Sequence, residues 1–347
     1  MLKKNVKVYL AFVIFAVVGI ALFWLLGFKE KPETRIIKHG EVPGEIIYTY
    51  SHPLNSPSKI VWTKDGSFIH EETINGIAIM YIQPDLQGNL WTPSTKNDKL
   101  YKLTSDYQVE TSRTPGTTKN FKILNGDKVS SHSNLSNIDF NKLWYEGEKK
   151  SFQMKLEGFL REFAKDGDKL YIFADFIAKG TSVLYEVDIP SEKITNTVPL
   201  PEGVADDMVI YQDKVVLVTK TSLTVVNRSD WKVSTVKLSY PDVRPVSLYT
   251  RDDHLYVTLR SDVDLSGLKI IKLDRNFNEV SKVDLGLVYS GDQYKDDKIY
   301  IYSGGNDPER GISGELSVYK LDTWERLGSL VLPSGPNNYN VSGFTVL

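Results

Sequence analysis

Residues 296–302 read DDKIYIY, an acidic pair followed by a strand-like run that alternates apolar with polar or aromatic residues. Nearly the same phrase occurs as DGDKLYIF from residue 166, QDKVVLV from 212 and DDHLYVTL from 252. Asn-Gly and Asp-Gly tolerate the positive φ of tight turns, so each phrase predicts a hairpin turn between two antiparallel strands. The polar turn positions follow one another at spacings of 38, 41, 45, 40 and 44 residues: Asn89, Asp127, Asp168, Asp213, Asp253 and Asp297.

A second phrase runs in step with the first. It reads LYKLTSDYQV from residue 100, LYEVDIPSEKI from 184, LTVVNRSDWKV from 223, IIKLDRNFNEV from 270 and VYKLDTWERL from 318. Each is a strand, a polar turn and a strand, so each repeat holds two hairpins. Four antiparallel strands at this period are typical of a β-propeller blade. A single blade cannot bury both of its faces, so blades stack around an axis.

The blade count follows from the length of the repeat. At about 44 residues per repeat, the chain after its first 40 residues accommodates seven blades. Six full motifs are visible, and residues 341–347 supply an inner strand that completes a seventh blade with the N-terminal strands at 44–73. Six and eight blades stay open, because the repeat at 117–157 is the least regular, and a pair of β-sandwiches is the alternative fold.

The repeated phrases D-K-L-Y and L-Y-x-L-D resemble the YVTN and quinoprotein-like propeller repeats. The resemblance covers residues 44–347 and concerns architecture, since the motif is loose. It implies a propeller fold. It says little about function, because that superfamily hosts binding proteins, scaffolds, lyases and dehydrogenases.

The N-terminal segment has a different character. Residues 8–28 read VYLAFVIFAVVGIALFWLLGF, 21 residues without a charge, which is long enough to cross a bilayer as a helix. Lys3, Lys4 and Lys7 precede it, so the positive-inside bias predicts a cytosolic tail at 1–7 and a type II orientation in the cell membrane. A cleaved signal peptide is the alternative, but the run is longer than usual and ends in bulky residues.

Residues 29–43 then predict a polar tether, and 44–347 an extracytoplasmic propeller of a bacterial surface protein. The segment 8–28 makes membrane lipid the first expected partner. The net charge of −2 argues against a nucleic-acid partner, which requires clustered basic residues. The chain has no cysteine, so disulfides and thiolate metal sites are excluded. No haem-attachment or nucleotide-loop motif is present, and no cofactor is expected.

Four charged residues predict a channel or face site. Asp206 and Asp207 directly precede an inner strand, Arg244 holds the matching place one blade on, and Arg161 lies close to it in an earlier blade. They favour either a ligand site or Asp–Arg ties between neighbouring blades. The repeated turn aspartates favour turn structure over a metal site, because Asp side chains bond nearby backbone there.

Two loops supply the other candidates. Residues 262–267 read DVDLSG, with Asp262 and Asp264 spaced like the first half of a calcium loop, but an apolar strand follows and the twelfth-position Glu is absent. No metal is therefore expected. Residues 303–314 form a Gly-rich connector with Asp307, Glu309 and Arg310 as candidate binding groups.

No cluster of titratable residues has the spacing of a known catalytic motif, while a propeller supplies a broad rigid surface. The sequence therefore predicts a membrane-anchored binding or scaffold module for a protein, peptide or glycan, and leans against an enzyme. The alternative is a propeller-type lyase or hydrolase acting on a cell-wall or extracellular polymer through Asp206, Asp207 and Arg244. Convergence of these three residues with Arg161 in an open axial pocket would favour the enzyme.

Overall fold

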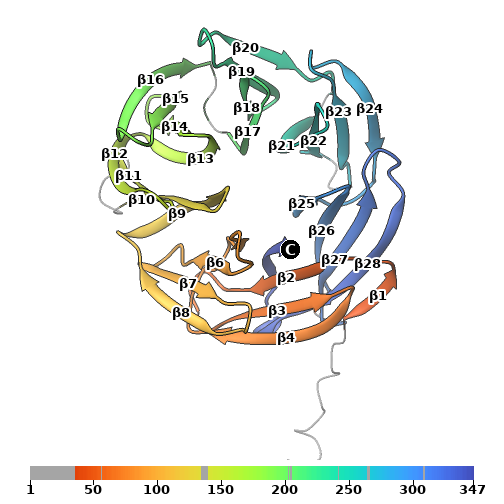
Figure 1. The fold of residues 1–347 in the computed structure, drawn as a ribbon. Coiled ribbons are helices and arrows are strands. Elements are labelled where there is room, and N and C mark those ends of the chain that lie inside the picture. Colours follow the sequence, from red (N-terminus) through yellow and green to blue (C-terminus); the bar gives the residue numbers. More distant parts are fainter. Residues whose placement is uncertain are drawn as a thin grey trace, which may run out of the picture. The chain divides into compact units, whose positions relative to one another are not determined.

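The computed structural model describes residues 36–347, apart from residues 56, 134–139, 202, 204, 241, 264–265 and 308. In this part of the chain the strands form seven antiparallel sheets that are arranged as blades around an axis (Figure 1). The all-β, seven-bladed propeller predicted from the repeats is confirmed. The alternatives of six blades, eight blades and paired sandwiches are excluded.

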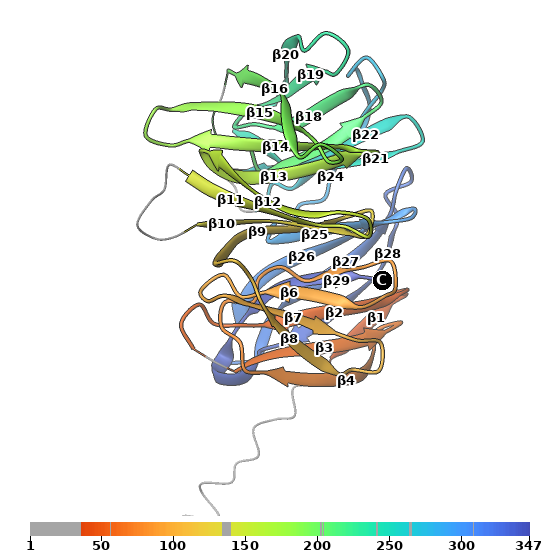
Figure 2. The same ribbon diagram turned by 60° about the vertical axis from the view of Figure 1, so that its left-hand side comes forward.

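Neighbouring strands run antiparallel in every blade, and Figure 2 shows the blades from a second direction. The blades are numbered here along the ring, and their strands are given from the axis outward. They are: first, β29 (Val341–Val346), β2 (Glu45–Tyr50), β3 (Ser58–Lys64) and β4 (Ser67–Ile74); second, β5 (Gln83–Pro84), β6 (Leu90–Pro93), β7 (Lys99–Leu103) and β8 (Val109–Arg113); third, β9 (Thr117–Leu124), β10 (Asp127–Ser133), β11 (Phe140–Glu146) and β12 (Ser151–Glu157); fourth, β13 (Phe159–Asp166), β14 (Lys169–Phe176), β15 (Thr181–Asp188) and β16 (Lys193–Leu200); fifth, β17 (Asp207–Tyr211), β18 (Lys214–Val218), β19 (Ser222–Asn227) and β20 (Val233–Lys237); sixth, β21 (Val243–Arg251), β22 (His254–Ser261), β23 (Lys269–Leu273) and β24 (Glu279–Asp284); seventh, β25 (Gly291–Lys295), β26 (Lys298–Asp307), β27 (Ile312–Lys320), β28 (Arg326–Pro333) and β1 (Ile37–Gly40).

The ring closes in the first blade, where the last strand of the chain joins the first hairpin. β29 pairs antiparallel with β2, and Phe344 lies opposite Tyr48. This is the closure that the sequence predicted from residues 341–347 and 44–73. An open ring would expose the faces of two sheets, so the closing strand is required for a complete core.

One part of the predicted tether, residues 29–43, is in fact a strand. β1 pairs antiparallel with β28 over four residues and gives the seventh blade a fifth strand. Its side chains are exposed, so no apolar pattern marked it in the sequence. The pairing depends on backbone hydrogen bonds, which sequence patterns do not reveal.

The core lies between the blades. The second and third strands of each blade carry the most fully buried residues, as in β18, where four of the five residues from Lys214 to Val218 are buried. Apolar clusters contain residues of neighbouring blades, for example Ile270 of the sixth blade with Ile299 of the seventh. The tyrosines after the repeated turns, Tyr171, Tyr256 and Tyr300, are each about 2% exposed and contribute to these clusters.

The repeated turns have the expected backbone conformation, but the aspartates do not all have the same role. Asn125 and Gly126 have φ values of 53° and 87°, as a tight hairpin turn requires. The side chain of Asp127, however, is 8% exposed, accepts a hydrogen bond from Tyr145 and pairs with Lys165 of the next blade at 2.5 Å. This aspartate therefore joins two blades instead of bonding its own turn.

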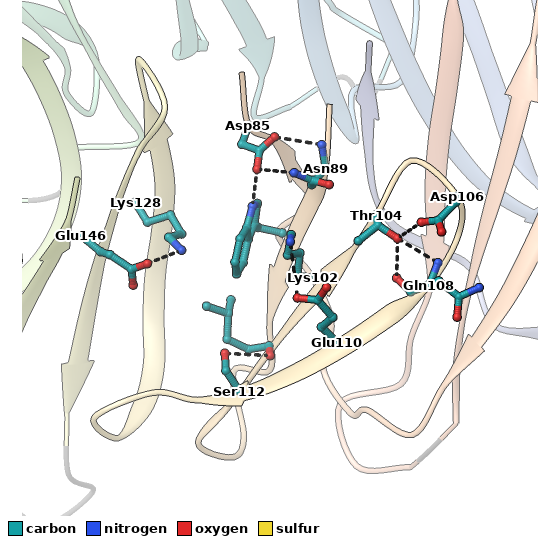
Figure 3. A network of polar contacts seen from close by, with 12 residues as sticks. Asp85, Asn89, Lys102, Thr104, Asp106, Gln108, Glu110, Ser112, Lys128 and Glu146 are labelled. Atoms are coloured by element: carbon teal, nitrogen blue, oxygen red, sulfur yellow. Dashed lines mark hydrogen bonds and ion pairs between the residues drawn. The ribbon is translucent and has the colours of Figure 1, made fainter. Parts of the chain in front are cut away.

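Polar side chains also lie at the junction of the second and third blades, among them Asp85, Lys128 and Glu146 (Figure 3). The Asp85 carboxylate accepts hydrogen bonds from the backbone N–H of Asn89 at 2.9 Å and from Trp91 Nε1 at 2.8 Å. Lys128 Nζ of the third blade lies 3.7 Å from the centroid of the Trp91 ring and pairs with Glu146 at 2.5 Å. These contacts orient the indole ring at the junction of the second and third blades.

None of the helices found among the described residues is long and apolar enough to cross a membrane. The predicted membrane anchor at 8–28 lies outside these residues, together with the predicted cytosolic tail at 1–7 and the first part of the tether.

Candidate functional site

The predicted site residues lie at one end of the strands. Asp206, Asp207 and Arg244 lie at or near the start of inner strands, and Arg161 is the third residue of β13. Asp262 follows the end of β22, and the loop after Asp307 connects β26 to β27. Inner strands of a propeller run in the same direction, so these positions share one face, called here the strand-entry face.

Arg244 and the two acidic residues around it tie the fifth and sixth blades together. The guanidinium of Arg244 lies 3.5 Å from Asp206 and 3.7 Å from Asp262. Asp206 precedes β17 and Arg244 belongs to β21, so the first of these pairs links neighbouring blades. The Asp206–Arg244 pair is thus a tie between neighbouring blades, which was the alternative to a ligand site at these residues.

Arg161 does not join this group. Its Nε donates a hydrogen bond at 3.2 Å to Asp175 of β14, within the same blade. Asp307 and Arg310 also pair locally, at 3.4 Å, and the Glu309 side chain is exposed in the same loop. Asp264 lies outside the described residues. Asp206, Asp207, Arg161 and Arg244 therefore do not converge on one pocket.

Asp207 is different, because it faces the axis and contacts other blades. Lys122 of β9 lies 2.6 Å from Glu162 of β13 and 3.1 Å from Asp207 of β17. The third and fifth blades are not neighbours, so Lys122 reaches Asp207 past the inner strand of the fourth blade. The three side chains keep 25%, 15% and 20% of their surface exposed, which is consistent with lining the axis.

This ion-pair cluster continues around the ring. The second carboxylate oxygen of Asp207 accepts a 2.8 Å hydrogen bond from the backbone N–H of Leu248 in β21. In the same strand, Ser247 donates at 2.5 Å to Asp292 of β25, which also accepts hydrogen bonds from Thr258 at 2.6 Å and Tyr289 at 3.0 Å. Polar side chains thus connect the third blade to the seventh along the axis.

Similar contacts connect the third blade to the fourth and to the second, and the second to the first. Gln83 of β5 accepts from the backbone N–H of Ile123 at 2.6 Å, and Asn120 of β9 donates to the carbonyl of Leu160 at 2.6 Å. Ser342 of β29 donates to the carbonyl of Ile79, just before β5, at 3.0 Å. We call this set of inter-blade contacts the axial ring.

Two carboxylates of the axial ring have raised pKa values. Burial raises the pKa of Glu162 to about 7, and the negative charge of Asp207 adds to the effect while Lys122 opposes it. Burial also raises the pKa of Asp292, against its three hydroxyl donors. Burial disfavours the charge of Lys122, but Glu162 and Asp207 outweigh it and raise the lysine pKa. A carboxyl group that titrates near neutrality can transfer a proton.

Sequence reasoning found Asp207 but missed Lys122, Glu162 and Asp292. For Glu162, but not for Lys122 or Asp292, a signal exists once the inner strands are aligned on their hairpin turns. The fifth residue from the end of five inner strands is polar or is glycine: Asn120, Glu162, Asp207, Ser247 and Gly291. This column of residues marks the axis, and it becomes visible only when strand ends are known.

The surface has two recesses near these groups. A pocket of about 340 Å³ lies at the inner end of the seventh, first and second blades and is lined by Asp292, Gln293 and Gln83 among others. A groove of about 550 Å³ lies between the fifth and sixth blades and contains Asp262.

Among the described residues, no group of three or more His, Cys, Asp or Glu is arranged to hold a metal ion.

No protein-family model matches the chain, and no curated protein matches its sequence. Solved structures are similar in fold. A functionally unknown protein from Desulfotomaculum acetoxidans has a TM-score of 0.59 and 10% identity, covering 87% of this chain and 98% of that one. A catalytically inactive virginiamycin B lyase from Staphylococcus aureus, in complex with quinupristin, has a TM-score of 0.54 and 12% identity, covering 86% and 99%. The dihydro-heme d1 dehydrogenase NirN has a TM-score of 0.57 and 10% identity, covering 87% and 75%.

At such identities the similarity shows the fold alone. The fold defines this chain as a seven-bladed β-propeller, and its neighbours of that fold include lyases and dehydrogenases. Their diversity leaves the function to be argued from the site.

Proposed function

We propose that this chain is a membrane-anchored binding module whose propeller holds a protein, peptide or glycan outside the cell. The observation that carries the proposal is the groove of about 550 Å³ between the fifth and sixth blades, which contains Asp262, one of the residues predicted to bind. Grooves of this size accommodate a segment of a polymer.

The chemistry of the groove suits a polar ligand. Its lining carries both signs of charge, with Lys237 opposite in sign to Asp242 and Asp262, together with the hydroxyls of Thr221 and Thr235. Such mixed charge and hydroxyl groups give hydrogen-bonding specificity for an amide or a sugar. The Arg244 tie behind the groove fixes Asp262 in place.

Site-specific cross-linking in native membranes tests the groove. A photoreactive amino acid replaces Lys237 in the groove, and a control variant carries it at Thr111, an exposed position on β8 of the second blade. We expect mass spectrometry to identify one partner attached through position 237 and none through 111. Equal labelling at both positions, or none at either, would contradict the proposal.

The membrane anchor and the extracytoplasmic location are part of the same proposal. They are supported by the uncharged run at 8–28 and the three lysines before it. We expect the intact chain to resist carbonate extraction from membranes and residues 36–347 to be cut by protease added to intact protoplasts. Release by carbonate, or protection from the protease, would contradict the anchor or the orientation respectively.

A second candidate is a lyase or hydrolase acting on a cell-wall or extracellular polymer. It is favoured by Glu162, whose pKa of about 7 and proximity to Asp207 suit acid–base catalysis. Incubation with purified peptidoglycan separates the two. The enzyme predicts new products with wild type and none with Glu162→Gln, whereas the binding module predicts no products with either protein.

A further inference from the structure

In the described part of the chain, an apolar cluster fills six of the seven junctions between neighbouring blades. These clusters span the first and second blades, the third and fourth, the fourth and fifth, the fifth and sixth, the sixth and seventh, and the seventh and first. None of them contains residues of both the second and the third blade. Burial of apolar surface is the main force that holds packed sheets together, so this junction lacks the contact that the other six share.

Large apolar side chains are buried at this junction, but outside the six clusters. Leu100 alternates along β7 with Tyr101, which packs toward the first blade, so Leu100 faces the third blade. Phe121 alternates along β9 with Lys122, which reaches the fourth and fifth blades, so Phe121 faces the second blade. Leu100 is 1% exposed and Phe121 is 2% exposed. Separation of the two blades would therefore expose both side chains.

Charged side chains at this junction form ion pairs within their own blade (Figure 3). Lys128 pairs with Glu146 at 2.5 Å inside the third blade, and Lys102 pairs with Glu110 at 3.4 Å inside the second. Two faces that compensate their own charges can separate without leaving an unpaired charge on either of them.

Polar contacts also cross the junction. Near the axis, Gln83 accepts a hydrogen bond from the backbone N–H of Ile123 at 2.6 Å, and Tyr81 donates at 3.2 Å to a backbone carbonyl of the third blade. Farther out, the amine of Lys128 lies over the ring of Trp91. Water can replace the partners of such hydrogen bonds, so they resist separation less than a shared apolar cluster does.

We propose that the ring opens reversibly between the second and third blades while its other six junctions stay closed. The second blade stays packed on the first through their shared cluster, and its hydrogen bonds to the third blade break. Its inner strand β5 has two residues, so little backbone pairing opposes the movement. Opening gives solvent and ligands access to the axial ring from the side. This property goes beyond the proposed partner groove and does not depend on it.

Single cysteines can report the opening, because the chain has none of its own. Leu100→Cys places a thiol at the second residue of a third strand, facing the next blade. Leu223→Cys is the matched control, because it has the equivalent place in the fifth blade, at a junction that a cluster fills. Both native side chains are at most 1% exposed.

We expect a neutral thiol reagent to modify position 100 of the full-length protein at least tenfold faster than position 223. Each rate is normalised to the rate of the same variant in denaturant. Equal rates, or faster modification at position 223, would overturn the proposal.

The urea dependence of the two rates separates local opening from unfolding of the whole ring. A local opening exposes little surface, so the rate at position 100 should hardly change at low urea concentrations, whereas the rate at position 223 should rise steeply. An equally steep rise at both positions would mean that this junction opens only on global unfolding, which would overturn the proposal.

Two backbone amides give the same comparison without a substitution. The N–H of Ile123 donates to Gln83 across this junction at 2.6 Å, and that of Leu248 donates to Asp207 across the junction of the fifth and sixth blades at 2.8 Å. We expect the Ile123 amide to exchange with deuterium at least tenfold faster, after correction for the intrinsic rates. This measurement decides the question if circular dichroism shows that Leu100→Cys does not fold. Equal protection of the two amides would overturn the proposal.

Discussion

Glu162 shows how one residue depends on the blades around it. Its carboxylate pairs with the amine of Lys122, which also contacts the carboxylate of Asp207, and burial raises the pKa of Glu162 from 4.5 to about 7. The folded state therefore binds one more proton than the unfolded state between these two pH values. Stability falls as the pH rises through this window and is constant with respect to this group above it.

Glu162→Gln removes this pH dependence, because glutamine does not ionise. A pKa shift of one unit corresponds to about 1.4 kcal/mol. We therefore expect the free energy of unfolding of the variant to rise by about 2 kcal/mol relative to that of wild type when the pH is raised from 5 to 8. Urea unfolding at the two pH values measures it. The control is Glu110→Gln, with a side chain that is 62% exposed, and its difference from wild type stays constant. A constant difference for Glu162→Gln would contradict the raised pKa.

The sequence placed Asp207 at the axis but not its partners, for a physical reason. Asp207 directly precedes an obvious apolar strand, so its place at a strand start is local information. Lys122 and Glu162 lie inside strands, and they meet only because the third, fourth and fifth blades face one axis. Contacts of that kind depend on the register of each blade, which no short pattern contains.

At the scale of the element, the turn between the third and fourth strands joins four of the blades to the blade that precedes each of them. An aromatic residue occupies this turn in four blades with φ between 58° and 65°, a conformation that is uncommon outside glycine and asparagine. Each ring packs on a ring of the preceding blade, at centroid distances of 5.4 to 6.5 Å. The pairs are Tyr107 with Trp62, Trp231 with Tyr171, Phe277 with Tyr211 and Trp324 with Tyr256.

Removing one of these rings should weaken a blade junction. Trp324→Ala deletes the contact with Tyr256 and exposes apolar surface, so we expect a loss of about 2 kcal/mol in the free energy of unfolding. Trp324→Tyr keeps a ring in the same turn and is expected to lose less than half as much. Urea unfolding curves provide the comparison. Equal losses in the two variants would mean that the ring contact is not the cause.

The fifth strand of the seventh blade can be tested in the same way. A Cβ atom at Gly328 would lie 2.4 Å from the carbonyl oxygen of His39 and 2.5 Å from that of Glu41, so Gly328→Ala forces β1 away from β28. We expect amide hydrogen exchange in residues 37–40 to accelerate at least tenfold, while β26 and β27 stay protected.

Gly305→Ala is the control, because nothing lies within 4 Å of its added Cβ. Unchanged exchange in β1 of the Gly328→Ala variant would show that this strand pairing does not protect the amides.

At the scale of the whole molecule, the ring depends on one junction between the two ends of the described chain. Ile47 of β2 lies opposite Thr345 of β29, and directly opposed residues of antiparallel strands have Cα separations that a disulfide can span. The chain has no cysteine of its own, so Ile47→Cys with Thr345→Cys forms a single defined bond.

We expect the oxidised double variant to be about 5 kcal/mol more stable than its own reduced form, because the bond closes a loop of almost the whole propeller. The reduced form is the control for the loss of two buried side chains, and urea midpoints with and without reductant measure the difference. Identical midpoints would contradict the expectation that closing this loop stabilises the folded ring.

The propeller itself was predictable because its turn residues repeat. Positions such as Asp213 and Asp297 start equivalent strands, and residues 341–347 remain as the strand that the first blade lacks. β1 was not predictable, because its exposed residues Ile37 and Lys38 follow no apolar pattern.

The closing strand also determines when the protein can finish folding during its synthesis. β2 ends at Tyr50, and its inner neighbour begins at Val341, which the ribosome adds almost three hundred residues later. At about 5 to 20 residues per second, the inner edge of β2 waits for about 15 to 60 s with its backbone hydrogen-bonding groups unpaired. The first blade to be made is therefore the last to be completed, and for that interval its open edge is where a nascent chain is most prone to pair with another.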